Sequence, residues 1–235
     1  MKKILVFDLD GTLLDSLADI RHALNTALGE HGLPPHDSES VRGMVGHGVP
    51  ELIKLAVGPA AAQAEAVLAR MRQIYREIPF RLTRPYPGIP ELLDELHAGG
   101  AILAVLTNKA EPIAQIIIDH FFKDRFALVQ GEMPQQPRKP HPDALLGLLK
   151  RLAPRAGLDP QDQAAWSRQA IMIGDGETDI HTAAAAGVRA IGVGWGFRSP
   201  AQLMAAGANE LVADVPALRV ALGLDGSRDT GLKSG

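Results

Sequence analysis

Between residues 88 and 222, short apolar runs alternate with segments that have the spacing of amphipathic helices. A buried strand shows as a short apolar run, and a helix places apolar residues three or four positions apart. Regular alternation of the two predicts a parallel, doubly wound α/β sheet with helices on both faces. The predicted strands are 101–106, 126–130, 170–173, 188–193 and 211–212, and the predicted helices are 91–98, 111–121, 142–152, 178–186, 200–206 and 216–222.

A further apolar strand, residues 3–7, opens the chain and is followed by a long stretch without another. Helical spacing is found at 16–30, 51–57 and 61–78, and no strand is predicted between residues 13 and 84. The pattern predicts a helical insertion immediately after the first strand. We therefore expect a core formed by residues 1–14 and 85–225, an all-helical cap of residues 15–84, and a flexible tail of residues 226–235.

Composition excludes several classes of function. The 235 residues carry a formal net charge of −3 without a concentration of Lys and Arg, so we expect no nucleic-acid partner. The chain has no cysteine, which excludes disulfides and thiolate metal sites. The apolar runs are too short for a membrane span or a signal peptide. We expect a cytoplasmic protein, either a monomer or a homodimer, that acts on a small molecule.

Polar side chains follow the strands at the points where the predicted strands end. In open parallel sheets, the ligand crevice lies beyond the carboxyl ends of the strands, so these side chains are expected to converge. Carboxylates without cysteine or a histidine cluster suit a hard, oxygen-preferring cation, Mg²⁺ above all. The residues are Asp8 and Asp10, then Thr107 and Asn108, then Lys139, and finally Asp175 and Asp179.

The same set can bind phosphate. At an effective dielectric constant near 20, two charges about 4 Å apart interact by roughly 4 kcal/mol, so a phosphate dianion needs cations beside these aspartates. Lys139, between Arg138 and Pro140, is the expected ammonium. The Thr107 hydroxyl and the backbone amides of Gly11 and Thr12 can donate hydrogen bonds to phosphate oxygens.

Each motif taken alone has an ordinary structural interpretation. Paired aspartates at a strand end are often turn or capping residues, and Thr107-Asn108 can cap a helix. Lys139 can be a solvated loop lysine, and Asp175 and Asp179 can begin the helix that follows them. A functional interpretation is favoured because four successive strand ends all carry the required chemistry.

The motifs DLDGTLLDS, LTN, RKP and GDGETD, in this order, resemble the four signature motifs of the haloacid dehalogenase superfamily. The resemblance covers nearly the whole chain. It implies a Rossmann-like core with a helical cap inserted after the first strand. It also implies that Asp8 is a nucleophile that forms an aspartyl-phosphate and that Asp10 is the general acid and base. Without the resemblance, the residues leave open whether Asp8 or Asp10 attacks.

The resemblance also implies roles for the other motif residues. Thr107 and Lys139 are implied to bind the transferring phosphoryl group. The implied Mg²⁺ site comprises Asp8, the backbone carbonyl of Asp10, Asp175 and Asp179. The second aspartate, Asp10, is absent from haloacid dehalogenases proper, which argues against carbon–halogen cleavage.

The glycine-rich segment 41–50 is a candidate for recognising the rest of the substrate. Backbone amides at such a turn can approach an anion, and Arg42 and His47 supply cationic side chains. This segment, the helix starting near Asp15 and the Thr107-Asn108-Lys109 motif resemble those of phosphoglycolate phosphatases. We expect 2-phosphoglycolate as the substrate, with Gly11, Thr12, Asn108, Arg42 and His47 as substrate-binding residues.

Three alternatives remain open from the sequence. A phosphosugar phosphatase and a β-phosphoglucomutase-like phosphotransferase share the motifs, although the mutase usually has extra basic residues near the cap hinge. A phospho-receiver module uses Asp, Thr and Lys without turnover, but its acceptor lies on a middle strand of the sequence. The long segment 154–169 and the proline-rich loop 131–137 depart from the phosphoglycolate phosphatase pattern and have no assigned role.

Overall fold

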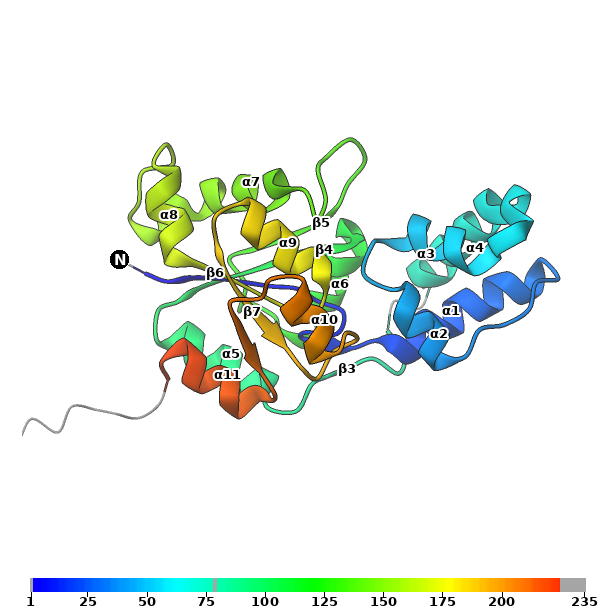
Figure 1. The fold of residues 1–235 in the computed structure, drawn as a ribbon, viewed down its shortest axis with the longest axis horizontal. Helices are drawn as coiled ribbons and strands as arrows, with labels where there is room; N and C mark the ends of the chain where they lie inside the picture. Colours follow the sequence, from blue (N-terminus) through cyan, green and yellow to red (C-terminus); the bar gives the residue numbers. More distant parts are fainter. Residues whose placement is uncertain (1, 78–79, 225–235) are drawn as a thin grey trace, which may run out of the picture.

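A computed structural model describes residues 2–77 and 80–224, and its centre is a six-stranded sheet (Figure 1). All neighbouring strands run parallel, in the order β5-β4-β1-β6-β7-β8. The predicted parallel α/β sheet is therefore confirmed. The predicted tail, 226–235, lies outside the described residues. The strands are β1 (Ile4–Phe7), β4 (Ile102–Ala110), β5 (Leu128–Glu132), β6 (Ala170–Gly174), β7 (Arg189–Val193) and β8 (Glu210–Val212).

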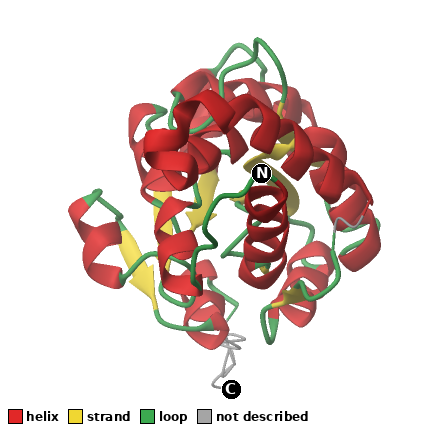
Figure 2. Cartoon of the chain, turned by 90° about the vertical axis from the view of Figure 1, so that its right-hand side faces the viewer, coloured by secondary structure: helices red, strands yellow, loops and turns green. Residues whose placement is uncertain are grey.

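Helices cover both faces of the sheet, and Figure 2 shows the strands enclosed by them. Alternate residues of β1 belong to two separate apolar cores: Leu5 and Phe7 to one, Ile4 and Val6 to the other. The first core is closed by α5 (Ile89–Ala98), α6 (Glu111–Phe121) and α11 (Val215–Leu222). The second is closed by α7 (Pro142–Leu152), η2 (Ala153–Ala156), α8 (Gln163–Gln169), α9 (Glu177–Ala185) and α10 (Pro200–Ala205).

The segment 154–169, unassigned from the sequence, contributes to the second core. Its helix α8 begins at Asp162, whose side chain accepts a hydrogen bond from the Ala165 amide at 2.9 Å. Trp166 is buried in the core below β6. The segment therefore packs against the sheet and does not line the cavity described below.

In the sequence, a helical insertion lies between β1 and the later strands of the sheet. It forms the right-hand part of Figure 1. Its ends meet as two short antiparallel strands, β2 (Leu14–Asp15) and β3 (Arg84–Pro85). The prediction of no strand after residue 13 was wrong here, because a two-residue ladder leaves no apolar run to detect. Between them lie α1 (Leu17–Glu30), α2 (Ser38–Met44), α3 (Val49–Val57), η1 (Gly58–Gln63) and α4 (Ala64–Glu77).

The helices of the insertion pack on one another, α1 against α4 and α2 against α3. Helix α2 was not predicted, because only one of its seven residues, Val41, is buried and so the segment has no apolar stripe. The division into a core of 1–14 and 85–225 and a cap of 15–84 stays a prediction.

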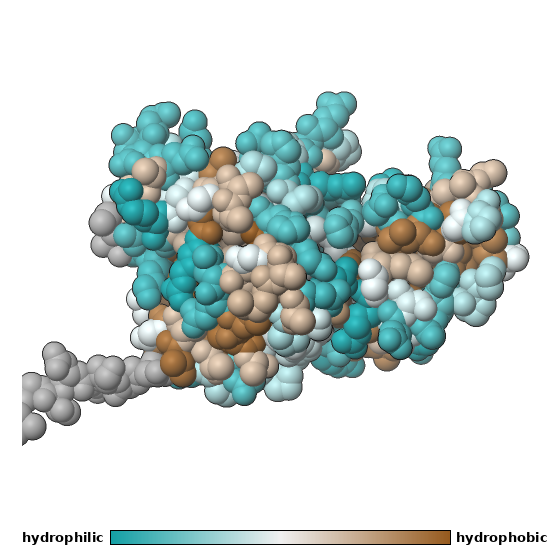
Figure 3. Space-filling model, in the orientation of Figure 1, coloured by the Kyte–Doolittle hydropathy of each residue, from teal (hydrophilic) through white to brown (hydrophobic). Residues whose placement is uncertain are grey.

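The stretch Val49–Glu77 is long and apolar enough, by composition, to cross a membrane, with a mean hydropathy of 1.3 in its best window. The stretch is not one helix. Gly58-Pro59 ends α3 after nine residues, and the backbone leaves helical geometry at Ala60 before α4 begins. A spanning helix needs about 20 residues, more than either piece has. The face shown in Figure 3 is mostly polar, with an apolar patch over α3.

Asp19 on α1 holds the chain where it returns from the insertion to the core. Its carboxylate accepts hydrogen bonds from the amides of Arg81, Leu82 and Thr83 at 2.8–2.9 Å and from the Thr83 hydroxyl at 2.6 Å. Burial opposes the charge on Asp19, but these hydrogen bonds outweigh it and lower the pKa of the carboxyl.

We expect Asp19→Ala to lower the free energy of unfolding by about 1–3 kcal/mol, because three backbone donors lose a buried acceptor. Urea unfolding at neutral pH measures this, and the exposed Asp119→Ala serves as the control, with an expected change within about 0.5 kcal/mol. Since folding lowers the pKa of Asp19, its contribution is complete above about pH 4 and lost as pH falls through the folded pKa. Equal stability of Asp19→Ala and wild type at pH 7 would contradict this role.

Candidate active site

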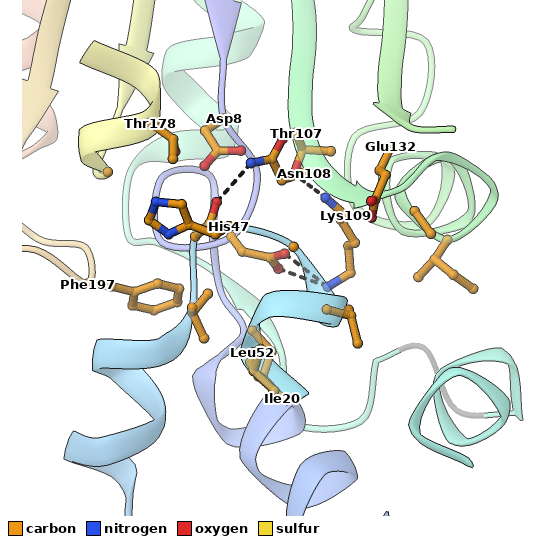
Figure 4. Close-up of a pocket in the computed structure, with 18 of the residues that line it drawn as sticks. Asp8, Ile20, His47, Leu52, Thr107, Asn108, Lys109, Glu132, Thr178 and Phe197 are labelled. Carbon is orange, nitrogen blue, oxygen red and sulfur yellow. Dashed lines mark hydrogen bonds and ion pairs between the residues drawn. The ribbon is translucent and has the colours of Figure 1, made fainter. Parts of the chain in front are cut away.

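A cavity of about 250 Å³ lies between the carboxyl ends of the central strands and the helical insertion. Its core-side wall includes Asp8 and Asp10 after β1, Thr107 and Asn108 near the end of β4, and Asp175 after β6. Figure 4 shows Asp8, Thr107 and Asn108 facing the cavity together with His47 of the insertion. The structure thus brings together residues that lie up to 167 positions apart in the chain, because β4, β1 and β6 are neighbours in the sheet.

Three carboxylates and one ammonium form the most buried part of this site. Ligand oxygens of Asp8, Asp175 and Asp179 all lie within 4.8 Å of one another. The Lys139 Nζ atom lies 2.8 Å from Asp8 Oδ1 and 2.6 Å from Asp179 Oδ1. Lys139 is 2% exposed, so the solvated-loop interpretation of this residue is excluded.

The charges in this cluster are unbalanced. Burial, together with the Asp179 charge, raises the pKa of Asp8 to about 7, although Lys139 acts in the opposite direction. Burial and the charges of Asp8 and Asp179 raise the pKa of Asp175 to about 8. Burial alone would lower the pKa of Lys139, but the Asp179 and Asp8 carboxylates raise it to about 12. Among the residues described, these three carboxylates therefore share one cation, Lys139, and a second cation would stabilise their ionised forms.

The donor set fits a magnesium ion. All of its candidate ligands are oxygens, which Mg²⁺ prefers. Asp8 Oδ1 is buried, and among the residues described its close partner is the Lys139 ammonium at 2.8 Å, which also pairs with Asp179. Since one ammonium serves two buried carboxylates, a further cation would stabilise this oxygen.

Asp10 is held by two residues that sequence reasoning did not select. The Lys109 ammonium lies 3.1 and 3.0 Å from the two carboxylate oxygens of Asp10, and the Ser16 hydroxyl donates to Oδ1 at 2.6 Å. Lys109 is also 4.7 Å from the ring centroid of Tyr75 on α4. The Thr107-Asn108-Lys109 motif could have indicated Lys109. Every second residue of a strand points to the same side, so Lys109 shares the side of Thr107. This follows only once β4 is known to continue to Ala110.

Gly11 and Thr12 are not among the residues that line the cavity, and their role as phosphate donors stays a prediction. The Gly11 amide donates to the Leu14 carbonyl at 2.9 Å and the Thr12 amide to Leu9 at 3.4 Å, so both are used within the loop. The Thr12 hydroxyl instead donates to Asp175 Oδ1 at 2.9 Å. Gly11 has a φ of +86°, and a Cβ there would lie 2.2 Å from Asp175 Oδ2, so only glycine fits.

Asn108 connects three parts of the structure. Its side-chain amide donates to the Gly46 carbonyl of the insertion and to the Lys139 carbonyl, both at 2.9 Å. Thr107 lines the cavity, and its hydroxyl accepts a hydrogen bond from the Lys109 amide at 3.2 Å. Asn108 therefore positions Lys139 and the glycine-rich segment together.

The two predicted cations of the glycine-rich segment have different positions. His47 lines the cavity, whereas Arg42 does not and donates to the Gly196 carbonyl at 3.3 Å. Three other arginines line the cavity and were missed: Arg198 of the core, and Arg72 and Arg76 on α4. A spacing of four residues places Arg72 and Arg76 on one face of α4, but a charged helix face usually faces solvent, so neither was selected from the sequence.

A family model for haloacid dehalogenase-like hydrolases matches residues 5–193. The chain belongs to this family. The predicted resemblance and the hydrolase class are confirmed, and the family match explains why the four motifs converge in the structure.

Relatives and solved structures agree with the assignment. Phosphoglycolate phosphatase 1 of Pseudomonas aeruginosa is 33% identical over 207 residues, 84% of this chain and 71% of that protein. The structure of a predicted phosphoglycolate phosphatase from Haemophilus somnus is 29% identical, with a TM-score of 0.79 over 94% of this chain and 97% of that one. The structure of Protein Tyrosine Kinase A of Mycobacterium tuberculosis is 30% identical, with a TM-score of 0.75 over 94% of this chain and 99% of that one. It has the same fold, although its name states another activity.

Proposed function

We propose that this chain is a Mg²⁺-dependent phosphomonoester hydrolase that acts through an aspartyl-phosphate on Asp8, with 2-phosphoglycolate as its substrate. The proposal rests chiefly on one observation. The Asp8 carboxylate lies at the end of β1, 2.8 Å from the Lys139 ammonium, while Asp10 lines the same cavity. Family membership and relatives that carry the phosphoglycolate phosphatase name support it.

In the first step, Asp8 attacks the phosphorus atom and the bond from phosphorus to the ester oxygen breaks. Protonated Asp10 gives its proton to the departing alkoxide. We assign the binding of the phosphoryl oxygens to Lys139, whose ammonium lies 2.8 Å from Asp8 Oδ1, and to the Thr107 hydroxyl of the cavity wall. Asp8, Asp175, Asp179 and the Asp10 carbonyl would hold Mg²⁺, which when bound neutralises the charge of the phosphoryl group.

In the second step, Asp10 takes a proton from water, which attacks the phosphorus atom of the aspartyl-phosphate and releases phosphate and free Asp8. The structure suits this base step. Lys109 contacts both oxygens of Asp10, at 3.1 and 3.0 Å, and so holds this carboxylate in place for proton transfer. Ser16, which directly follows β2, donates a hydrogen bond to the same carboxylate and so orients it.

The cavity favours a small, anionic leaving group. Its volume of about 250 Å³ lies just below the range of about 300–1,000 Å³ that is typical of small-molecule sites. Ile20, Leu52, Met71 and Ile113 form part of its wall. Sugar hydroxyls against such a wall would lose hydrogen bonds at a cost of roughly 1–3 kcal/mol each. This argues against the phosphosugar phosphatase and mutase alternatives.

Cationic side chains of the insertion are available to bind the glycolate carboxylate. His47, Arg72 and Arg76 line the cavity, and among residues 2–77 and 80–224 none of them forms an ion pair. Because Arg42 points to the Gly196 carbonyl, we assign the carboxylate contact to Arg72 and Arg76 with His47, and not to Arg42.

We expect Asp8→Asn to abolish phosphate release, because an amide is a poor nucleophile, and Asp10→Asn to lower kcat by about 10²–10⁴-fold. Phosphate release from 2-phosphoglycolate measures both, with the exposed Asp143→Asn as a matched control at the wild-type rate. Trapping of radiolabelled phosphoprotein should succeed in Asp10→Asn and fail in Asp8→Asn. Turnover by a purified Asp8→Asn protein would overturn the nucleophile assignment.

Removal of the metal is expected to abolish activity, and Mg²⁺ to restore it. In Asp175→Ala, Mg²⁺ binding measured by calorimetry should weaken at least tenfold, as removal of one of few oxygen ligands predicts, while Asp143→Ala binds as wild type. Full activity after exhaustive chelation would contradict a metal-dependent mechanism.

The substrate assignment is tested with Arg72→Gln and Arg76→Gln. Each should lower kcat/KM for 2-phosphoglycolate by about tenfold and leave kcat/KM for p-nitrophenyl phosphate nearly unchanged, since the aryl ester has no carboxylate. Arg70→Gln, on the same helix but paired with Glu30 outside the cavity, is the control. An equal fall for both substrates removes the carboxylate contact, and a wild-type preference for a hexose phosphate removes phosphoglycolate as the substrate.

A further inference from the structure

Arg198 belongs to the core and lies five residues after Val193, the last residue of β7. Its side chain reaches into the helical insertion. Its guanidinium donates to the carbonyl oxygens of Arg42 at 2.8 Å, Gly43 at 3.4 Å and Val45 at 2.6 Å. These carbonyls lie at the carboxyl end of α2, where a helix has unpaired acceptors and a partial negative charge. A buried cation of the core therefore caps a helix of the insertion.

The same core segment contacts the candidate metal ligand Asp175. The Phe197 amide donates to Asp175 Oδ2 at 2.7 Å, and the Arg198 Nε atom is 2.9 Å from Glu177 Oε2. At Gly196, a Cβ would lie 2.2 Å from the Cβ of Asp175, so the backbone is pressed against that residue. Residues 196–198 thus contact Asp175 on one side and the insertion on the other, and position both.

The contacts of Arg198 leave it little capacity to bind a substrate. A guanidinium has five N–H donors, and the contacts to Glu177 and the three carbonyls use four of them. Arg198 is also only 9% exposed. Arg198 therefore acts on the site indirectly, through the segment that it holds.

We infer that Arg198 is a positioning residue that holds residues 42–48 of the glycine-rich segment over the strand ends in register with Asp175. Asn108 holds the same segment from the β4 side through the Gly46 carbonyl. Loss of Arg198 frees residues 42–48, and with them His47, from the cavity. The inference rests on the proposed function in one respect, that this segment covers the bound phosphomonoester.

Arg198→Gln and Arg198→Lys test this. Neither side chain can bridge Glu177 and three carbonyls. Amide hydrogen exchange should accelerate in residues 42–48 and remain unchanged in the sheet. KM for 2-phosphoglycolate should rise about tenfold or more, and kcat should change much less, as expected when charge-assisted hydrogen bonds that favour the covered site are lost. Arg189→Gln, which removes an Arg–Glu pair on the exposed side of β7, should change neither measurement.

A raised KM with unchanged exchange in 42–48 would overturn the inference, because Arg198 would then act on the substrate directly. Unchanged KM and exchange would also overturn it. If Arg198→Gln raises exchange throughout the chain, Glu177→Gln decides: faster exchange confined to 42–48 supports the inference, and unchanged exchange there refutes it. Exchange is measured without substrate, so failure of wild type to hydrolyse 2-phosphoglycolate refutes the proposed substrate and not this result.

Discussion

The ion cluster of Lys139 with Asp8 and Asp179 is the interaction on which the rest of the site depends. Asp179 is fully buried and Lys139 nearly so, and a buried charge without a partner would be strongly destabilising. Lys139 is held in turn by Asn108, whose side-chain amide donates to the Lys139 carbonyl and to the Gly46 carbonyl of the insertion. The cluster therefore joins β1, β4, α9 and the insertion, and it leaves an excess of negative charge that suits a cation and a phosphate together.

The sheet and the core of the site could be predicted because both depend on local patterns. Apolar runs located β1, β4 and β6, and parallel pairing then required Asp8, Thr107 and Asp175 to meet at one edge. Helix α2 and the β2–β3 ladder could not be predicted, since neither buries an apolar stripe. The role of 154–169 required the structure, because only packing shows Trp166 in the core.

Residues of the site that act through contacts with other elements were missed for a different reason. In the sequence, nothing distinguishes these residues from ordinary surface cations. Only the tertiary structure shows that they line the cavity; they are Lys109, Arg72, Arg76 and Arg198. The role of Gly11 and Thr12 as phosphate donors, in contrast, stays a prediction. Their amides are suited to phosphate, but the turn after β1 uses them to close itself around Asp175.

The structure separates the two tasks of a phosphomonoester hydrolase. The groups proposed to act on the phosphoryl, which every such substrate shares, come from the core and are fixed by buried ion pairs. The cations proposed to bind the leaving group come from α4 and the glycine-rich segment, which hydrogen bonds from Asn108 and Arg198 connect to the core. Substitution in the insertion can therefore change the preferred ester without disturbing Asp8 or Asp175, provided that these two connections, which place the insertion relative to the cluster, are kept.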